Sequence, residues 1–300
     1  MYRNLNCDLV GITGRQSEII ELALTFGFRG IDIDINDLVK RCERSSLESA
    51  ARFLISSKLK IGSFHVPVDL DTDEQSFEEA LKSLKQAAEI AGRVEAKVGI
   101  VDIPTQTDRL PYPEYFEVIR KRVEQLAALF GEEDVKIALA MQSATAEDKQ
   151  FKFIQDVEGF VALANTCKSV GIVLDLWTWF CGKGNVEDLA KIGVERVYAV
   201  RLADCKEGVA PEAATESDCM LPGTVGTIDP VPYVQQVAAA ELDIPVSAGG
   251  SFSNTGGKRD QFIEKIQDRL HDILTNAGLP SRLRKPAEIA EAAYPSKSPA

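Results

Sequence analysis

The stretch VGIVLDL, residues 170–176, is an apolar run that ends in a single acid, Asp175. A strand this apolar is typical of a sheet that is covered on both faces, as in parallel α/β folds. Both tryptophans of the chain, Trp177 and Trp179, follow the run directly. The stretch therefore predicts a buried strand whose carboxyl end carries one carboxylate and an aromatic pair.

Seven further β-rich runs accompany this stretch, and helical patterns with apolar residues three and four positions apart lie between them. The eight runs cover residues 4–12, 29–35, 60–68, 97–104, 135–142, 170–176, 197–204 and 244–250. Eight strand–helix units are the count of a (β/α)8 TIM barrel. A doubly wound open sheet is the structural alternative, but no GxGxxG follows the first strand. We predict a single-domain α/β barrel over residues 1–280 and a C-terminal tail, 281–300, that is partly helical or frayed.

The composition narrows the classes of function. The chain has 34 Lys and Arg against 46 Asp and Glu, and the net charge of −12 argues against nucleic acid and an acidic membrane surface as partners. No apolar stretch approaches the roughly 20 residues of a membrane span, and the first residues lack the layout of a signal peptide. The six cysteines include no CxxC, as expected of reduced thiols in a cytoplasmic protein. We expect a small-molecule partner, and a homo-oligomer is compatible with the sequence.

Polar residues stand where most of the predicted strands end. In a TIM barrel, the functional side chains lie at these ends and on the loops that follow. The set comprises Asp34, His65, Asp102, Gln142, Asp175 with Trp177 and Trp179, Arg201 with Asp204, and Gly249. We therefore expect the ligand site at this end of the barrel.

Several short motifs resemble, in their order and spacing, those of the xylose isomerase-like TIM barrels, which are sugar isomerases, epimerases and endonuclease-type relatives. The motifs are FGFRGIDIDI (26–35), SFHVP (63–67), LDL (174–176), VRLAD (200–204), LPGTVGTIDP (221–230) and PVSAGG (245–250). The resemblance covers the chain up to about residue 276, and GTVG with the following Ile-Asp is its most characteristic piece. It implies a TIM barrel and an isomerase or epimerase activity on a small sugar or polyol.

The resemblance also implies a divalent metal held by Glu, Asp, His and Glu on strands five to eight. The two glutamates exchange a proton with the sugar, and a His three residues after the Asp touches the substrate. Here the ligand positions carry Gln142, Asp175, Arg201 and Gly249 (or Ala248 in a shifted register), and Thr178 replaces the second His. Since an amide is no base and a guanidinium neither deprotonates nor ligates, we predict that the site holds no metal and no other cofactor.

Arg201 is expected beside Asp175, because strands six and seven are neighbours in the barrel. A lone carboxylate in the interior would be costly or would protonate, and a bidentate guanidinium offsets that cost. A structural ion pair and a contact to a substrate carbonyl or carboxylate are both open for Arg201. His65 is a candidate general base, with a hydrogen-bonded core His or a substrate contact as the alternatives. Asp175, Arg201 and His65 are thus the candidate catalytic residues.

A second group of strand-end residues is expected to bind the substrate. The group is Gln142, Trp177, Trp179, Asp102, Asp204 and Gly249. A tryptophan suits the C–H face of a sugar ring. Because alternate positions of an extended segment face opposite ways, one tryptophan should line the pocket and the other should pack beneath it. Asp204 is expected to shape the loop that follows it.

The loops after strands six to eight offer two weaker candidate sites. Cys181, Cys205 and Cys219 fall at the same barrel end, but their spacings match no zinc signature, so ordinary thiols are favoured over a soft-metal site. The glycine-rich loop 247–260, with Lys258 and Arg259, suits a sugar phosphate or simply a flexible loop near the pocket.

Two functions are left open. The first is an isomerase- or epimerase-like enzyme, which would need Asp175, His65 and Asp102 as its acid–base groups and Arg201 as its electrophile. The second is a non-catalytic sugar-binding or regulatory relative, which the three replaced ligand positions favour.

Overall fold

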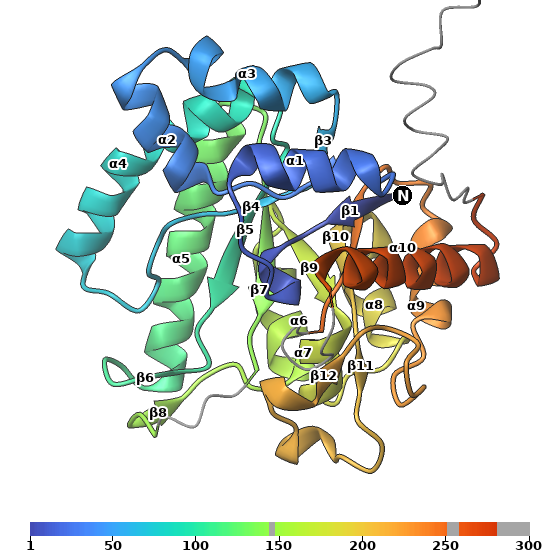
Figure 1. Cartoon of the computed structure of the whole chain (residues 1–300). Helices are drawn as coiled ribbons and strands as arrows, with labels where there is room; N and C mark the ends of the chain where they lie inside the picture. Colours follow the sequence, from blue (N-terminus) through green and yellow to red (C-terminus); the bar gives the residue numbers. More distant parts are fainter. Residues whose placement is uncertain (144–147, 251–257, 281–300) are drawn as a thin grey trace, which may run out of the picture.

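The computed structural model describes residues 1–143, 148–250 and 258–280, and its main feature is a nine-stranded parallel sheet surrounded by helices (Figure 1). The strand order is β3-β2-β1-β13-β10-β9-β7-β5-β4. The strands are β1 (Tyr2–Leu5), β2 (Gly30–Ile31), β3 (Lys60–Ile61), β4 (Phe64–His65), β5 (Val98–Ile103), β7 (Lys136–Met141), β9 (Gly171–Asp175), β10 (Val197–Leu202) and β13 (Pro245–Ala248).

The sheet closes on itself through its two end strands, because β3 and β4 are halves of one segment. The amide of Gly62 donates to the carbonyl of Ile31 on one side, at 2.8 Å, and the amide of Val66 donates to the carbonyl of Ile100 on the other, also at 2.8 Å. The nine strands therefore form an eight-stranded barrel, in which β3 and β4 together make one strand. The prediction of a (β/α)8 barrel is confirmed, while the tail 281–300 lies outside the described residues.

Helices follow the strands and cover the outside of the barrel (Figure 1). The α-helices are α1 (Gln16–Thr25), α2 (Ile35–Arg44), α3 (Leu47–Ser57), α4 (Glu74–Arg93), α5 (Tyr112–Gly131), α6 (Val157–Thr166), α7 (Leu176–Cys181), α8 (Asp188–Ile192), α9 (Val231–Ala238) and α10 (Arg259–Asn276). Short 3-10 helices are η1 (Asp8–Val10), η2 (Val194–Arg196), η3 (Pro211–Ala213) and η4 (Glu216–Asp218).

Two small antiparallel pairs build the loops at the carboxyl ends of the strands. β6 (Gln106–Thr107) pairs with β8 (Phe151–Lys152), and β11 (Asp204–Cys205) pairs with β12 (Cys219–Met220). All four strands lie in the lower part of Figure 1. This end of the barrel is therefore framed by structured loops.

Two separate apolar clusters explain why polar residues collect at the strand ends. The larger cluster packs the helices on the sheet, and a small one of Val98, Ile100, Ala138, Ala140, Val173 and Ala199 fills the barrel interior. Strand side chains alternate between the two faces with a period of two. The inner face of β5, for example, carries Val98, then Ile100, then Asp102, so the strand-end polar residues continue the inward-facing row.

Candidate functional site

Asp175, Arg201 and Ser247 form one row across three neighbouring strands. Arg201 on β10 is in register with Asp175 on β9 and with Ser247 on β13. Paired residues of parallel strands point to the same face, so all three belong to the inner face. The eighth-strand residue beside Arg201 is therefore Ser247, and not Gly249 or Ala248 as expected from the sequence, because the register pairs Arg201 with residue 247.

The Arg201 guanidinium lies between a carboxylate and an imidazole. Its Nη1 is 3.9 Å from Oδ2 of Asp175, and its Nη2 is 3.1 Å from Nε2 of His65. The two charged side chains are only 9% and 12% exposed. Because arginine can only donate, Nε2 of His65 is the acceptor of this bond, and Nδ1 is the ring nitrogen that faces Asp102. The lone pair of His65 is thus already used.

Asp102 and Gln142 extend this contact to two more strands. Nδ1 of His65 is 3.4 Å from Oδ2 of Asp102, and Nε2 of Gln142 donates to Oδ1 of the same carboxylate at 2.7 Å. The polar chain Gln142–Asp102–His65–Arg201–Asp175 therefore spans β7, β5, β4, β10 and β9. Five of the residues that the sequence predicts for the site come together in it.

The carboxylate of Asp175 has a backbone hydrogen bond on only one of its two oxygens. One oxygen accepts from the amide of Trp177 at 3.0 Å, which also caps helix α7. Burial raises the pKa of this carboxyl, and the charge of Arg201 with the amides of Trp177 and Thr178 opposes the rise only in part. The group is thus a carboxyl whose proton affinity is above its ordinary value, next to a fixed cation.

Asp32 is a second inner carboxylate, which the sequence reasoning missed in favour of Asp34. Its oxygens accept from the side-chain amides of Asn4 and Asn6 at 2.8 and 2.5 Å. They also accept from the amide and hydroxyl of Ser63 at 2.9 and 2.7 Å. Asp34 instead caps helix α2 through the amide of Asp37.

Burial raises the pKa of Asp32, while Ser63, the charge of Arg201 and Asn4 lower it. The charge of Arg201 therefore acts on both inner carboxylates. The sequence did contain a sign that Asp34 caps a helix, because an Asp is a favoured N-cap residue and the amide of Asp37 follows three positions later.

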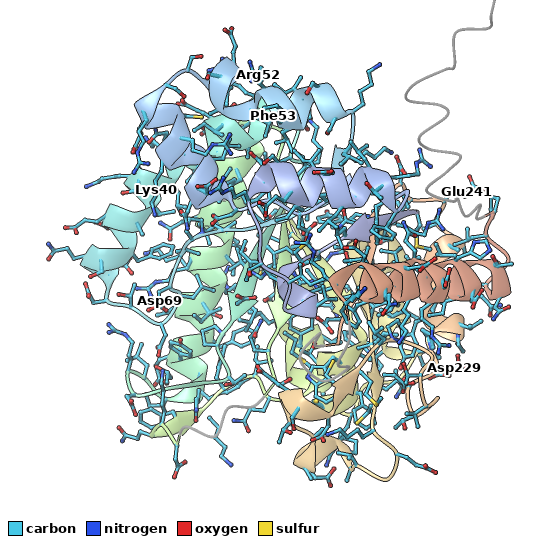
Figure 2. All side chains as sticks on the ribbon, in the orientation of Figure 1. Lys40, Arg52, Phe53, Asp69, Asp229 and Glu241 are labelled. Atoms are coloured by element: carbon cyan, nitrogen blue, oxygen red, sulfur yellow. The ribbon has the colours of Figure 1, made fainter. Side chains whose placement is uncertain are left out.

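A cavity of about 510 Å³ opens at this end of the barrel and connects the polar chain with the loops. Trp177, Thr178, Asp102, Gln142, Asp175 and Arg201 line it, together with Lys149 and Glu216 from the loops. Asp69, which extends to the surface in Figure 2, borders the same cavity. Lys149 and Glu216 were not singled out from the sequence, because Lys149 lies in a loop and Glu216 in the short helix η4, and neither segment carries a motif.

The two tryptophans have different places, and the expectation that only one lines the pocket agrees with them. Trp177 borders the cavity and is 8% exposed, whereas Trp179 is 1% exposed. The Nε1 of Trp179 donates to the carbonyl of Asn185 at 3.0 Å, and its ring packs edge-on against Phe160. The expected extended segment is wrong, however, because both residues belong to helix α7, started by the cap of Asp175.

Asp71 ties together three of the loops around the cavity. It accepts from the hydroxyls of Thr107 and Tyr115 at 2.6 and 2.9 Å and from Nζ of Lys149 at 3.1 Å. Burial alone would raise the pKa of this carboxyl, but the bonds from Thr107, Lys149 and Tyr115 outweigh it and lower the pKa. The rim of the cavity is thereby fixed on the side of β6 and β8.

Asp204 organises the rim on the other side. It accepts four backbone bonds, from the amides of Cys205, Val225, Gly226 and Ile228, at 2.7 to 3.0 Å. Burial would raise the pKa of Asp204, but these four N–H groups outweigh burial and lower it. Two of the four donors, Val225 and Gly226, belong to the GTVG turn and Ile228 follows it, so the side chain shapes the loop.

The structure describes the three cysteines in full but only part of the glycine-rich loop 247–260, the other weak candidate site. Cys205 and Cys219 are directly opposed in the pair β11–β12, and α7, which ends at Cys181, packs against β11. Of the glycine-rich loop, residues 251–257 lie outside the described residues. Lys258 precedes α10 and Arg259 begins it.

The donor set at the strand ends does not fit a divalent metal. An amide, one carboxylate, a guanidinium and a hydroxyl occupy the four positions, and a fixed positive charge repels a second cation. Within residues 1–143, 148–250 and 258–280, no group of three or more His, Cys, Asp and Glu side chains could hold a metal ion. Over the same residues, no helix is long and apolar enough to span a membrane.

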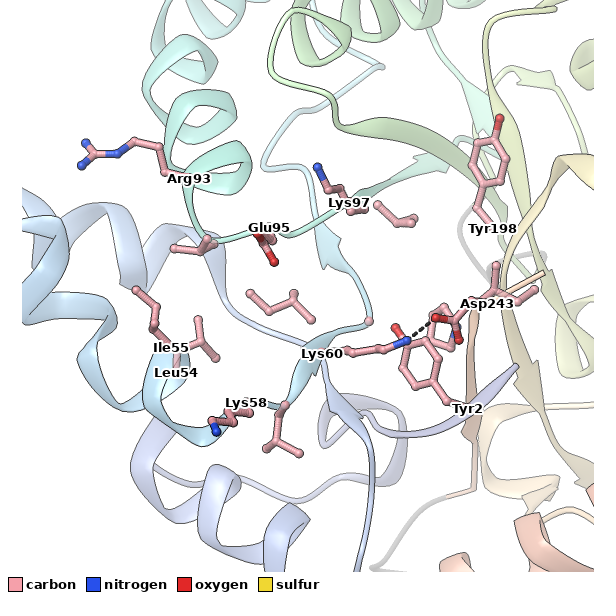
Figure 3. Close-up of a pocket in the computed structure, with 17 residues that line it drawn as sticks. Tyr2, Leu54, Ile55, Lys58, Lys60, Arg93, Glu95, Lys97, Tyr198 and Asp243 are labelled. Carbon is pink, nitrogen blue, oxygen red and sulfur yellow. Dashed lines mark hydrogen bonds and ion pairs between the residues drawn. The ribbon is translucent and has the colours of Figure 1, made fainter. Parts of the chain in front are cut away.

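A second cavity, of about 560 Å³, lies at the opposite end of the barrel (Figure 3). Lys60 and Asp243 form an ion pair in it, and Lys60 also stacks on the ring of Tyr2. Its residues come from strand starts and the loops before them, where TIM barrels carry stability and not chemistry. The cavity at the carboxyl ends is therefore the candidate site.

Similar folds occur among solved structures. A xylose isomerase domain protein from Alicyclobacillus acidocaldarius subsp. acidocaldarius is 22% identical with a TM-score of 0.80, covering 93% of this chain and 99% of that one. IolI protein with a bound zinc atom is 17% identical with a TM-score of 0.78, covering 92% and 99%. A D-tagatose 3-epimerase-like protein is 15% identical with a TM-score of 0.63, covering 93% and 98%.

These identities show the fold alone, and no curated protein sequence matches the chain. The sequence model described as "Xylose isomerase-like TIM barrel" matches residues 20–267. Since this span is most of the 300 residues and includes every strand that carries the polar chain, the protein belongs to the xylose isomerase-like TIM barrel family.

Proposed function

We propose that the protein binds a small sugar or polyol in the cavity at the carboxyl ends of the strands, with the Arg201 guanidinium in place of a divalent metal. The observation that carries the proposal is the position of Arg201. It is in register with Asp175 and lies within 3.1 Å of the His65 imidazole, so one fixed cation stands at the centre of the polar chain.

The lining of the cavity supports a polyhydroxylated ligand. Asp102 and Asp175 offer acceptors, Gln142 offers an amide with both a donor and an acceptor, and Arg201 offers donors. Trp177 supplies an apolar wall for the C–H face of a sugar ring. A volume of about 510 Å³ lies within the usual range for small-molecule sites.

The metal-dependent chemistry implied by the family has no counterpart among these residues. IolI protein has been solved with a zinc atom, but here Gln142, Arg201 and Ser247 stand where ligands would be needed. We therefore derive the binding mode without a metal. A ligand carbonyl or carboxylate would accept from Arg201, which costs little because its geometry is already fixed by His65 and Asp175.

Catalysis is a second candidate, favoured by the state of Asp175. A carboxyl whose pKa is raised by burial is a better base than an ordinary one, and Arg201 beside it could stabilise a developing oxyanion. His65 does not add a second base while Arg201 uses its Nε2 lone pair. One base suits aldose–ketose isomerisation, in which a single group carries the proton, better than an epimerisation that needs a base on each face.

The test is a melting-temperature screen with aldoses, ketoses, polyols and their phosphates, each with EDTA and with manganese, followed by calorimetry of the hits. We expect a hit that is independent of manganese, is lost in Arg201→Met and is kept in Arg120→Met, a surface arginine on α5. Binding that requires manganese, or that survives in Arg201→Met, would overturn the proposal. Deuterium uptake from D2O into the bound sugar, followed by NMR, separates the enzyme from the binding protein.

A further inference from the structure

Cys205 and Cys219 are direct cross-strand neighbours in the antiparallel pair β11–β12, which packs beside α7 (Figure 1). The flanking backbone bond runs from the amide of Lys206 to the carbonyl of Asp218, at 3.1 Å. This bond joins the residue after Cys205 to the residue before Cys219. The two cysteines therefore form a non-hydrogen-bonded pair, in which the side chains of an antiparallel ladder lie closest.

Such a pair meets the distance requirement of a disulfide. The Cα atoms of a non-hydrogen-bonded pair are about 4.5 Å apart, at the lower end of the range of about 4.4 to 6.8 Å seen in disulfides. Both side chains of a directly opposed pair lie on the same face of the ladder. Bridging the two sulfurs thus needs a rotation of side chains and no movement of the backbone.

We propose that Cys205 and Cys219 form a reversible disulfide, a modification site at the rim of the cavity. Cys219 is partly exposed, whereas Cys205 is buried, so Cys219 meets the oxidant first. Its thiolate attacks one sulfur of a low-molecular-weight disulfide and releases one thiol. The thiolate of Cys205 then attacks the sulfur of Cys219 and releases the second thiol. The protein loses two electrons, and its two thiol protons end on the two released thiols.

The position of the pair links it to the cavity. The bond closes the loop 205–219, and Glu216, three residues before Cys219, lines the cavity beside Trp177 and Arg201. Constraining both ends of that loop reduces the freedom of the unfolded chain. Oxidation therefore fixes the segment that carries Glu216 and raises the melting temperature by several degrees.

Cys181, on α7, is the third thiol near the pair and could compete with Cys205 for a disulfide to Cys219. Burial raises the pKa of Cys181 to about 11, and a hydrogen bond with Ser143 opposes this rise only in part. Burial also raises the pKa of Cys205 and Cys219. Few thiolates exist at pH 7, so the reaction with oxidised glutathione should accelerate about tenfold per pH unit up to pH 9.

The experiment uses the full chain with oxidised glutathione at pH 7 to 9, followed by alkylation of free thiols, trypsin digestion without reductant and mass spectrometry. The two cysteines fall in different tryptic peptides, because Lys206 lies between them. We expect these peptides to be joined, Cys181 to be alkylated, and dithiothreitol to reverse the link. Cys181→Ser should keep the link, whereas Cys205→Ser and Cys219→Ser should lose it.

Three results would overturn the proposal: a bridge to Cys181, a protein that carries only mixed glutathione disulfides, or free thiols throughout at pH 9. The same reaction in urea shows whether the fold selects the pair, since an unfolded chain should join Cys167 to Cys181, which have the same separation in sequence, as readily as Cys205 to Cys219. The wild-type result does not depend on how well any variant folds.

Discussion

Asp175 and Asp204 stand at the ends of neighbouring strands, yet their surroundings treat the negative charge in opposite ways. Asp204 accepts four backbone N–H bonds, and they outweigh burial and lower its pKa. Asp175 accepts one amide bond at 3.0 Å and has a guanidinium at 3.9 Å, and burial prevails, so its pKa is raised. A carboxylate whose lone pairs are all used by the backbone holds a loop, whereas one with unused capacity beside a cavity can receive a ligand.

The largest effect is expected from Asp204→Asn. The side-chain NH2 of the asparagine faces two of the four backbone N–H groups that now donate to Asp204, so two backbone amides lose their acceptor. We expect a loss of about 3 kcal/mol in the free energy of unfolding, measured with urea. Asp229→Asn is the matched control, because exposed Asp229 (Figure 2) accepts one amide bond, from Val231, and should cost at most about 0.5 kcal/mol. Equal costs for the two variants would remove the distinction between Asp204 and an ordinary loop acid.

The second effect tests whether the Asp175 side is an incomplete metal site. The triple variant Gln142→Glu, Arg201→His, Ser247→Glu places two carboxylates and an imidazole around Asp175. We expect it to bind manganese, with a stabilisation of about 2.7 kcal/mol at 100 times the dissociation constant, read as a shift in melting temperature. The wild-type protein should show no shift.

The control for this variant carries Gly249→Glu in place of Ser247→Glu. Residue 247 is paired with Arg201, whereas residue 249 lies two positions further along the chain, past the end of β13, so the control should bind manganese weakly. If the control bound as well as the triple variant, the strand register at β13 would be wrong at this position.

The eight-stranded order, the inward row of polar residues and the pairing of Asp175 with Arg201 could be predicted from the sequence, because strand periodicity and strand order alone decide them. The choice of Asp34 over Asp32 failed, since the strand ends earlier than its apolar pattern and Asp34 becomes a helix cap. The prediction of an extended segment at Trp177 and Trp179 failed for the same reason, because the strand ends at Asp175 and a helix begins directly after it.

The sequence alone did not predict which residue of the eighth strand lies beside Arg201, or which loop residues line the cavity. The glycines of PVSAGG do not show where the strand stops, so a shift of two residues left no trace in the sequence. Lys149 and Glu216 reach the cavity because β6–β8 and β11–β12 fold back over it. Long-range loop packing of this kind has no local pattern, whereas the motif-bearing strands do.

The third effect is a difference in pH dependence between the two acids. The pKa of Asp175 is raised in the folded state, so its contribution to stability falls as the pH rises from the ordinary value of about 3.9 through the raised one. The pKa of Asp204 is lowered, so its contribution is complete above about 3.9 and is lost as the pH falls through the lowered value.

Urea unfolding of Asp175→Asn and Asp204→Asn between pH 3 and 8 measures both slopes. Relative to wild type, Asp175→Asn should gain stability as the pH rises, by about 1.4 kcal/mol for each unit of pKa shift. Asp204→Asn should instead recover relative to wild type as the pH falls below about 4. Parallel slopes for the two variants would mean that both carboxylates are held alike.

The smallest effect on stability is expected at the exposed end of the polar chain. His65 and Asp102 are about half exposed, and an ion pair or hydrogen bond in that setting contributes little because water competes for both groups. Asp102→Asn should therefore change the free energy of unfolding by less than about 0.5 kcal/mol. It should nevertheless weaken ligand binding, since Asp102 holds the His65 tautomer whose Nε2 accepts from Arg201. If the variant lost about as much stability as Asp204→Asn and bound the ligand unchanged, the polar chain would serve stability only, and the ligand would bind elsewhere than at Arg201.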